Sequence, residues 1–429
     1  MQGKETFEMK IAALCLFVLT YALMIGLPKY RPYYAMGTAV LYLILGILPL
    51  SEIGTAVNWN VLMMITGTMI MVDYFIDSKM PNRLADLLLD RAGNVMWATV
   101  IMSLFAGVIS AFIDNVATVL IVAPVGLAIC KKIGINPVGM ILSIAVSSNL
   151  QGAATLVGDT TSIMLGDYAN MNFMNFFWML GKPGIFFAVE LGALATVPIM
   201  MALFRKQRDP VRAEEKAEVR NYLPTVMLLT MVAALIGVSF WREAPSYING
   251  LICCLLAAAT VLIDLLFTKS TQGIRRAVRG LDYETLLLLT GLFIVIGGIT
   301  KAGVMDDFAA LIIRVGGGNT LLLYSLIVWG SVLISAFVDN IPYVATMLPV
   351  LTAVTTALGT EPYLFYFGLL TGATLGGNLT PIGASANIAA VGLLKKEGWT
   401  VKYRDFMKIG VPYTLTAVFV GYLYFWFIW

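Results

Sequence analysis

Two apolar segments of the chain each contain an aspartate followed by an asparagine. The first, SAFIDNVATVLIVAPV, holds Asp114 and Asn115, and the second, SAFVDNIPYVATMLPV, holds Asp339 and Asn340. Either pair could cap a helix, but serine or asparagine would do so without burying a charge. A carboxylate deep in a membrane costs roughly 2.5 to 3.5 kcal/mol even on lenient scales. We therefore expect the carboxylates to bind a cation or a proton, with the asparagines as neutral oxygen ligands.

Two further segments interrupt apolar stretches with glycine, threonine and proline. They read GAATLVGDTTS (152–162) and GGNLTPIGASAN (376–387). Backbone groups without helical partners are tolerated inside a membrane only where they are buried in protein, line a wet cavity or bind a ligand. The breaks therefore indicate a site near the midplane, shared with the two Asp-Asn tips. The candidate ligands in the breaks are Thr155, Asp159, Thr160, Ser162, Asn378, Thr380, Ser385 and Asn387, for each of which local helix-end bonding is the alternative.

The charges of these segments restrict what they can bind. They contain Asp114, Asp159 and Asp339 but no lysine or arginine, and Ala384 stands where the first half has Asp159. Four helix N-termini, at about +0.5 each, would offset about two negative charges. A dianion would therefore be repelled unless protons or sodium ions accompanied it. A cation, a proton or a neutral hydroxide fits these residues better.

Other ionisable and metal-binding residues contribute little to this site. Glu190 lies in the middle of an apolar stretch, where it is either a proton relay or a carboxyl group hydrogen-bonded between helices. Asp73 and Asp264 lie near span ends, where we expect them to reach water. The chain has no histidine, and its four cysteines lack metal-ligand spacing. We expect no cofactor, no enzymatic activity and no coupling ion other than sodium or a proton.

The composition shows what kind of protein positions these residues. Of 429 residues, 59% are hydrophobic and 12% are charged, and the mean hydropathy is +0.86. Soluble domains carry about 25% charged residues, so we predict an all-α polytopic protein of a bacterial-type inner (plasma) membrane. No apolar segment has the features of a cleaved signal peptide, and nothing indicates nucleic-acid binding. Its partners are then the lipid bilayer and a small ion or molecule.

Apolar segments predict ten crossings and two hairpins. The crossings are 11–27, 34–50, 61–76, an interrupted segment 137–170, 176–203, 223–240, 248–267, 285–300, an interrupted segment 361–393, and 408–429. The stretches 95–129 and 321–353 are too long for one span, and each could turn at its Asp-Asn pair to form a re-entrant hairpin with two short arms.

Basic residues indicate the orientation of these crossings. With both termini outside, the loops 28–33, 77–94, 129–136, 204–222, 268–284 and 393–408 lie inside and hold 22 of the 28 basic residues. This asymmetry agrees with the positive-inside rule, although Lys4 and Lys10 near the N-terminus oppose it.

An internal repeat divides the chain around a charged linker. Ser110, Asp114, Asn115 and Pro124 recur at one constant offset as Ser335, Asp339, Asn340 and Pro349, and the register continues through both breaks. Each half has five predicted crossings, so the second half should be inverted relative to the first. We predict a first repeat (1–203), a cytoplasmic linker (204–222) and a second repeat (223–429), each repeat with one hairpin and one broken helix.

The motifs SAFxDN…PV, SSNLQGAATLVGD and GGNLTPIGASANIAA resemble the ion transporter superfamily, in particular the branch with the ArsB arsenical pumps, the NhaD sodium/proton antiporters and the melanosomal P protein. The similarity covers nearly the whole chain. The related divalent-anion/sodium symporters have Ser-Asn-Thr at the tips, where this chain has Asp-Asn-Val and Asp-Asn-Ile. Relatives typically show GDPPN in the first break, whereas this chain has GDTTS, which puts the first ion site in question.

The resemblance implies a homodimeric secondary transporter with a static scaffold and a mobile part built from the hairpins and broken helices, moving as an elevator. Together with the site residues, it favours sodium/proton antiport through Asp114 and Asp339. Proton-coupled efflux of arsenite or antimonite is one alternative, although no cysteine near the motifs supports thiolate capture of arsenic. Sodium- or proton-coupled transport of a dicarboxylate or another anion is the other.

Overall fold

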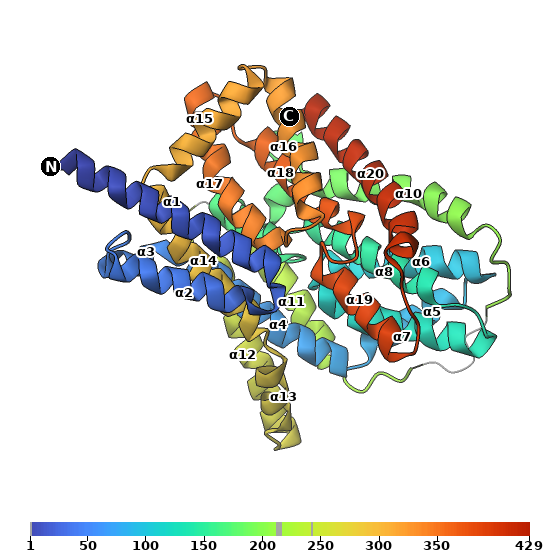
Figure 1. Cartoon of the computed structure of the whole chain (residues 1–429). Coiled ribbons are helices and arrows are strands. Elements are labelled where there is room, and N and C mark those ends of the chain that lie inside the picture. The colour runs from blue at the N-terminus through green and yellow to red at the C-terminus, as the bar shows by residue number, and fades with distance from the viewer. Residues whose placement is uncertain (1, 212–216, 242) are drawn as a thin grey trace.

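The computed structural model describes residues 2–211, 217–241 and 243–429, which fold almost entirely into helices (Figure 1). Of the predicted linker 204–222, residues 212–216 lie outside this described part. The elements of the first half are α1 (Gln2–Gly26), η1 (Pro28–Tyr30), α2 (Arg31–Ile44), η2 (Leu50–Glu52), α3 (Ile53–Ala56), α4 (Trp59–Asp77), α5 (Met80–Leu89), α6 (Val95–Ser110), α7 (Asn115–Ile133), α8 (Val138–Gln151), η3 (Gly152–Ala154), α9 (Thr160–Tyr168), η4 (Phe173–Phe176), β1 (Trp178–Met179), β2 (Lys182–Pro183) and α10 (Ile185–Phe204). Those of the second half are α11 (Leu223–Val238), α12 (Ile248–Thr268), α13 (Gln272–Gly280), α14 (Tyr283–Lys301), α15 (Val304–Gly316), α16 (Thr320–Ser335), α17 (Asn340–Leu358), α18 (Tyr363–Gly376), η5 (Gly377–Leu379), α19 (Ser385–Lys396) and α20 (Tyr403–Ile428).

Eight of these helices are long and apolar enough to cross a membrane, or nine if the bent pair α15 and α16 forms one span. Six of the eight, α1, α4, α10, α12, α14 and α20, coincide with predicted crossings. The other two, α7 and α17, were predicted as hairpin arms shorter than a span, but each has 19 residues. Conversely, α2 and α11 have only 14 and 16 residues. An all-helical polytopic membrane protein is thus confirmed, with fewer full-length spans than expected.

Each Asp-Asn pair lies at the turn between two helices. Asp114 ends the turn between α6 and α7, and its Oδ1 accepts hydrogen bonds from the amides of Val116 at 2.9 Å and Ala117 at 3.2 Å. Asp339 caps α17 in the same way, with the Ile341 amide donating to Oδ1 at 3.2 Å. Helix capping therefore occurs at both tips, and it occupies one oxygen of each carboxylate.

Each break packs closely against the tip of its own half. The Thr155 hydroxyl donates to the carbonyl of Ala111, and at the equivalent position of the second half the Thr380 hydroxyl donates to that of Ala336 at 2.5 Å. A Cβ on Gly158 would lie 2.5 Å from the carbonyl oxygen of Gly152, so only glycine fits there. These contacts hold the interrupted backbone against the tips.

The helices form two groups. In the hairpin group (α6–α10 and α16–α20), α6 packs on α8, α16 on α18, and α10 lies along α20. In the flanking group (α1, α2, α4, α11, α12 and α14), α2 packs on α14 and α4 on α12. The groups meet where α4 contacts α9 and where α14 contacts α17. The tips and breaks therefore face the flanking helices.

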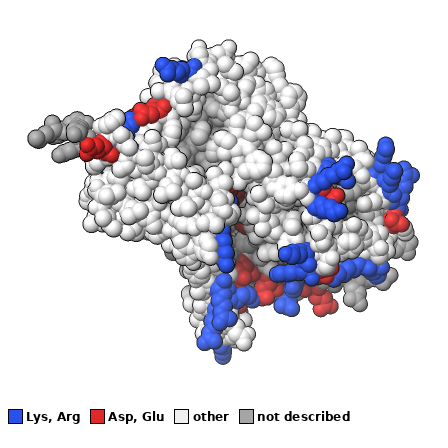
Figure 2. All heavy atoms as spheres, viewed as in Figure 1, with Lys and Arg blue, Asp and Glu red and all other residues white. Residues whose placement is uncertain are grey.

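Charged residues gather on one face of the molecule. Figure 2 shows lysines and arginines concentrated along the lower face, from which α13 projects in Figure 1. The helix α13 contains Arg275, Arg276 and Arg279, and α7 and α19 each have two lysines in their last turn. Most of the remaining visible surface is uncharged, as expected where lipid surrounds a protein.

Candidate functional site

Both tips and both breaks border one pocket of about 290 Å³. Residues of α4 and of the start of α14 also line it, so the pocket lies between the two helix groups. Seven of the predicted site residues line it: Asp114, Asn115, Asp159, Thr160, Asp339, Asn340 and Ser385. Thr155, Ser162, Asn378, Thr380, Asn387 and Glu190 are not among the lining residues. The structure thus brings the tip residues together at the pocket, whereas most of the predicted break residues do not line it.

The two tip aspartates differ in their surroundings. Among the described residues, the ion pairs include none with Asp114. Asp339 Oδ2, in contrast, accepts from Nη1 of Arg31 at 3.0 Å, and the two side chains are only 14% and 15% exposed. Arg31 begins α2 and belongs to a loop that the sequence analysis placed in the cytoplasm. The charge balance drawn from the tips and breaks alone was therefore incomplete.

Asp159 lines the pocket and has one buried carboxylate oxygen without a hydrogen bond among the described residues. Its side chain is 7% exposed, and its Oδ1 accepts from the Thr161 amide at 3.2 Å, which caps α9. Its Oδ2 has no hydrogen-bond partner among the described residues. A buried carboxylate oxygen without a donor is costly unless a cation or a proton occupies the space beside it. Asp159 is therefore a candidate ligand for a cation or a proton.

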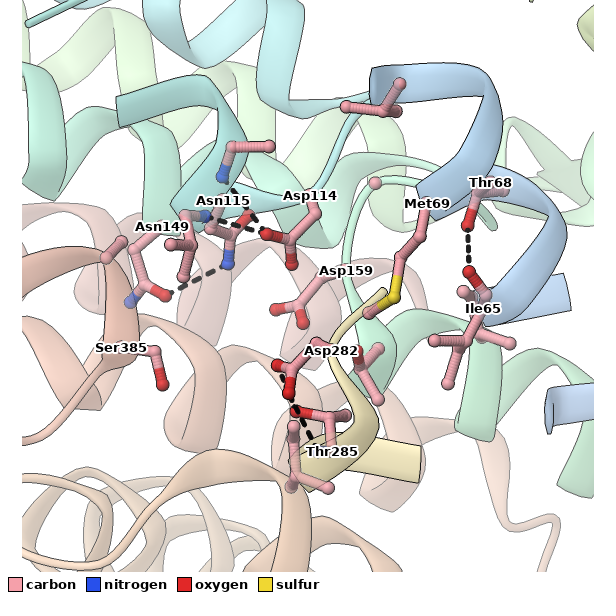
Figure 3. Close-up of a pocket in the computed structure, with 18 of the residues that line it drawn as sticks. Ile65, Thr68, Met69, Asp114, Asn115, Asn149, Asp159, Asp282, Thr285 and Ser385 are labelled. Carbon is pink, nitrogen blue, oxygen red and sulfur yellow. Dashed lines mark hydrogen bonds between the residues drawn. The ribbon is translucent and has the colours of Figure 1, made fainter. Parts of the chain in front are cut away.

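Another carboxylate, that of Asp282, lines the pocket from the flanking group. Asp282 caps α14, where it accepts from the Thr285 amide at 3.0 Å and from the Thr285 hydroxyl at 2.6 Å. Figure 3 shows Asp114, Asp159 and Asp282 one below another along the pocket, each from a different element. Asp282 falls in the predicted loop 268–284 and was not among the predicted site residues. Its position directly before an apolar helix was the available signal.

Asp73 also lines the pocket, although the sequence analysis left it out as a residue near a span end. Its Oδ2 accepts from Nε of Arg276 on α13 at 2.8 Å, so its charge is compensated. Three carboxylates, those of Asp114, Asp159 and Asp282, thus remain without a basic partner among the described residues. No group of three or more histidine, cysteine or acidic side chains there is close enough to hold a metal ion in this conformation.

Buried amides link the first tip to the second break. The Asn115 amide donates to Oδ1 of Asn149 at 3.1 Å, and Asn149 donates in turn to Oδ1 of Asn378 at 3.1 Å. Asn387 also donates to Oδ1 of Asn378, at 3.3 Å. Asn149, which was not among the predicted site residues, therefore makes one of the connections between the halves.

Ser162 and Asn387 occupy equivalent positions in the two breaks and share one property. Both side chains are fully buried, and Ser162 Oγ and Asn387 Oδ1 have no hydrogen-bond partner among the described residues. Glu190 is half-buried on α10 and lies outside the pocket lining, so its role as a proton relay stays a prediction.

A second, larger cavity of about 1070 Å³ lies toward the opposite ends of α4 and α14. Within it, Asp167 at the end of α9 accepts from the side-chain amides of Asn58 and, at 2.5 Å, Asn60. Asn58 caps α4 and Asn60 lies in its first turn. The hairpin and flanking groups are therefore hydrogen-bonded to each other at the second cavity.

Comparison with known proteins relates this arrangement to a family. The family model of citrate transporters (CitMHS) matches residues 19–366 and 251–429. The chain is 29% identical over 428 residues to an uncharacterized transporter of Mycobacterium tuberculosis, covering 97% of this chain and 98% of that one. It is 28% identical over 437 residues to a 46 kDa membrane protein of Mycobacterium leprae, with the same coverage. The mycobacterial relatives agree with a bacterial-type plasma membrane.

One more distant relative by sequence and two solved structures are also similar to this chain. The human P protein is 24% identical over 445 residues, covering 86% of this chain and 53% of its own length. The YdaH transporter of Alcanivorax borkumensis has a TM-score of 0.62 at 14% identity and covers 98% of this chain and 97% of its own. MtrF of Neisseria gonorrhoeae, described as one of a class of antimetabolite efflux pumps, has a TM-score of 0.56 at 14% identity and covers 85% of this chain and 80% of its own.

The resemblance to the ion transporter superfamily is thereby confirmed, and the relatives are transporters rather than enzymes. The chain belongs to the citrate transporter (CitMHS) family and is a multi-pass integral membrane protein that acts as a secondary transporter.

Proposed function

We propose that the protein exchanges sodium, or another small cation, for protons at the pocket between the two tips. The observation that carries this proposal is the set of carboxylates there. Asp114 and Asp159 lack a basic partner among the described residues, and Oδ2 of Asp159 lacks any hydrogen bond there. Such carboxylates favour a cation or a proton over an anion. The neutral oxygens of Asn115, Asn340 and Ser385 border the same space.

Exchange follows from competition at these carboxylates. A proton and a sodium ion cannot occupy the same carboxylate oxygen, so binding of one releases the other. A helix cap fixes each carboxylate and leaves its second oxygen for the ligand, as at Asp159. The unpartnered oxygens of Ser162 and Asn387 support further cation ligation behind the pocket, even though GDTTS replaces the more usual GDPPN.

The proposed transport cycle uses the predicted topology. In it, the repeats 1–203 and 223–429 are inverted, α6–α7 and α16–α17 are re-entrant hairpins, and the hairpin group moves as an elevator against the flanking group in a homodimer. Support comes from helices that start at equivalent positions of the two repeats. The helix α6 starts at Val95 and α16 at Thr320, and α8 starts at Val138 and α18 at Tyr363.

By the positive-inside rule, the basic face with α13 is cytoplasmic. The pocket lies beside Asp282 and Gly280 on that side. In the proposed cycle, the structure is therefore an inward-facing state.

Coupled uptake or efflux of a carboxylate is the second candidate. The family model is that of citrate transporters, and Arg31 brings a cationic group next to the pocket. Since Arg31 is already paired with Asp339, a carboxylate substrate would need sodium ions or protons bound at Asp114 and Asp159. Arsenite efflux stays an alternative from the resemblance alone, and no contact in the pocket favours it.

Purified protein reconstituted in liposomes with a pH-sensitive dye distinguishes these functions. Sodium, lithium, citrate, succinate and arsenite are added in turn. Sodium or lithium should drive proton movement without any other solute. No response to either cation, with a response to citrate or succinate, would replace the proposal by carboxylate transport, and a response to arsenite alone would favour arsenite efflux.

A further inference from the structure

The two tips are alike in sequence but unequal in charge. At the first tip, Asp114 has no ion pair among the described residues, whereas at the second tip Asp339 is paired with Arg31 at 3.0 Å. Both members of this pair are largely buried, so water screens it little. The remaining oxygen of Asp339 caps α17. A cation that binds the carboxylate of Asp339 therefore competes with the guanidinium group of Arg31 for Oδ2.

A further hydrogen bond anchors Arg31 to the flanking group. Its Nε donates to the carbonyl of Met24 at 3.2 Å, which ties the side chain to the end of α1. The helix that it begins, α2, packs along α1 and α14. Nearby on α1, Tyr21 also reaches the second hairpin, where it donates to the carbonyl of Pro342 at 2.7 Å and contacts Thr346. The ion pair thus bridges the two groups that the proposed cycle moves apart.

We infer that Arg31 is a tethered counter-ion that displaces the transported cation from Asp339 in this conformation and so promotes release on the face that carries α13. This inference rests on the proposed function. Moving the hairpin group away from α2 separates the pair, which leaves Asp339 free to bind a cation. When the hairpin group returns, the guanidinium group competes with the cation at Asp339. Arg31 is therefore a positioning residue that makes cation affinity differ between the two faces.

The test measures sodium affinity on the cytoplasmic face. Everted vesicles expose this face, and sodium-induced loss of a proton gradient is followed by dye fluorescence. Arg31→Gln should lower the half-saturating sodium concentration by about tenfold, because the competing charge is gone. Arg31→Lys keeps the charge and should stay within about threefold of the original protein. In an Asp339→Asn background, Arg31→Gln should have no further effect.

Lys10→Gln is the matched control, because Lys10 pairs with Asp307 at 2.7 Å in the same part of the chain but does not line the pocket. It should leave the sodium affinity unchanged. If Arg31→Gln does not yield folded protein, Arg31→Met removes the charge with a side chain of similar shape. An unchanged or raised half-saturating concentration in the neutral variant, or a shift that persists beside Asp339→Asn, would overturn the inference.

A second measurement separates this inference from the proposed function. If the original protein shows no sodium/proton exchange, the proposed function fails. Thermal unfolding of the original protein, Arg31→Gln, Asp339→Asn and the double variant then gives the coupling between the two residues. A coupling that sodium chloride reduces more than choline chloride supports competition at Asp339. No coupling, or a coupling that sodium does not change, contradicts it.

Discussion

Replacing Asp159 by asparagine tests whether its unpaired oxygen binds the transported cation. The change removes one negative charge while keeping a side chain that caps a helix as well as aspartate does. The cap on the Thr161 amide is thereby retained, since that hydrogen bond uses the oxygen that asparagine keeps. Protein stability should therefore change little, and any large effect should appear in ion binding.

The expected magnitude follows from the burial of this carboxylate. Asp159 is 7% exposed, so an effective dielectric constant of about 20 applies. A sodium ion about 4 to 6 Å from the charge then gains about 3 to 4 kcal/mol. Asparagine still offers a neutral oxygen, so we expect a loss of about 2 to 3 kcal/mol. This corresponds to a rise of about 30- to 150-fold in the half-saturating sodium concentration.

Sodium-dependent proton movement in proteoliposomes measures this change. Asp264→Asn is the control, because Asp264 is an acid near the end of α12 that does not line the pocket. It should leave the half-saturating concentration within about twofold. If Asp159→Asn transports sodium with unchanged affinity, or if both variants lose affinity equally, the assignment of Asp159 as a cation ligand is wrong.

Two further predictions concern the breaks and the topology. Gly158→Ala and Gly383→Ala should each destabilise the protein by about 2 kcal/mol or more, because the added Cβ would lie 2.5 Å from a backbone carbonyl oxygen. Thermal unfolding measures this loss. The control is Gly93→Ala, because a Cβ at Gly93 meets no atom within 4 Å. Equal melting temperatures for all three variants would refute the close packing. Single cysteines in the loops 129–136 and 354–361 should react with an impermeant reagent from opposite sides of the membrane, and labelling from one side would exclude inverted hairpins.

The sequence was most informative where polar residues interrupt apolar segments. Carboxylates and helix-breaking residues are rare in membrane spans, so Asp114 and the Gly152 break stood out without any structure. The structure places both at one pocket or against it. The internal repeat also predicted that Thr155 and Thr380 are equivalent, and the two hydroxyls do make equivalent hydrogen bonds.

Residues that reach the pocket from loops and helix ends were not predictable in this way. Arg31 and Asp282 fall in the segments 28–33 and 268–284, which were predicted as polar loops, where charged residues are common and carry no specific signal. Only the packing of α2 and α14 beside the tips brings them to the site. Asn149 lies among small polar residues of α8, and its connecting role depends on the meeting of the two halves.

Span lengths were the least accurate part of the fold prediction. The hydropathy pattern predicted a crossing over 34–50, which extends beyond the end of α2, because the apolar residues after Ile44 form turns. The short amphipathic helices α5 and α13 lie in segments that were predicted only as loops. Tertiary contacts such as the pair of Arg276 with Asp73 hold α13 against α4, and a hydropathy pattern does not contain such contacts.

The most direct test of the account compares proton movement driven by sodium in proteoliposomes of the original protein, Asp114→Asn and Asp339→Asn. Sodium should drive proton release in the original protein, Asp114→Asn should abolish it, and Asp339→Asn should strongly reduce it. Transport and pH dependence that both substitutions leave unchanged would contradict cation and proton exchange at the two tips.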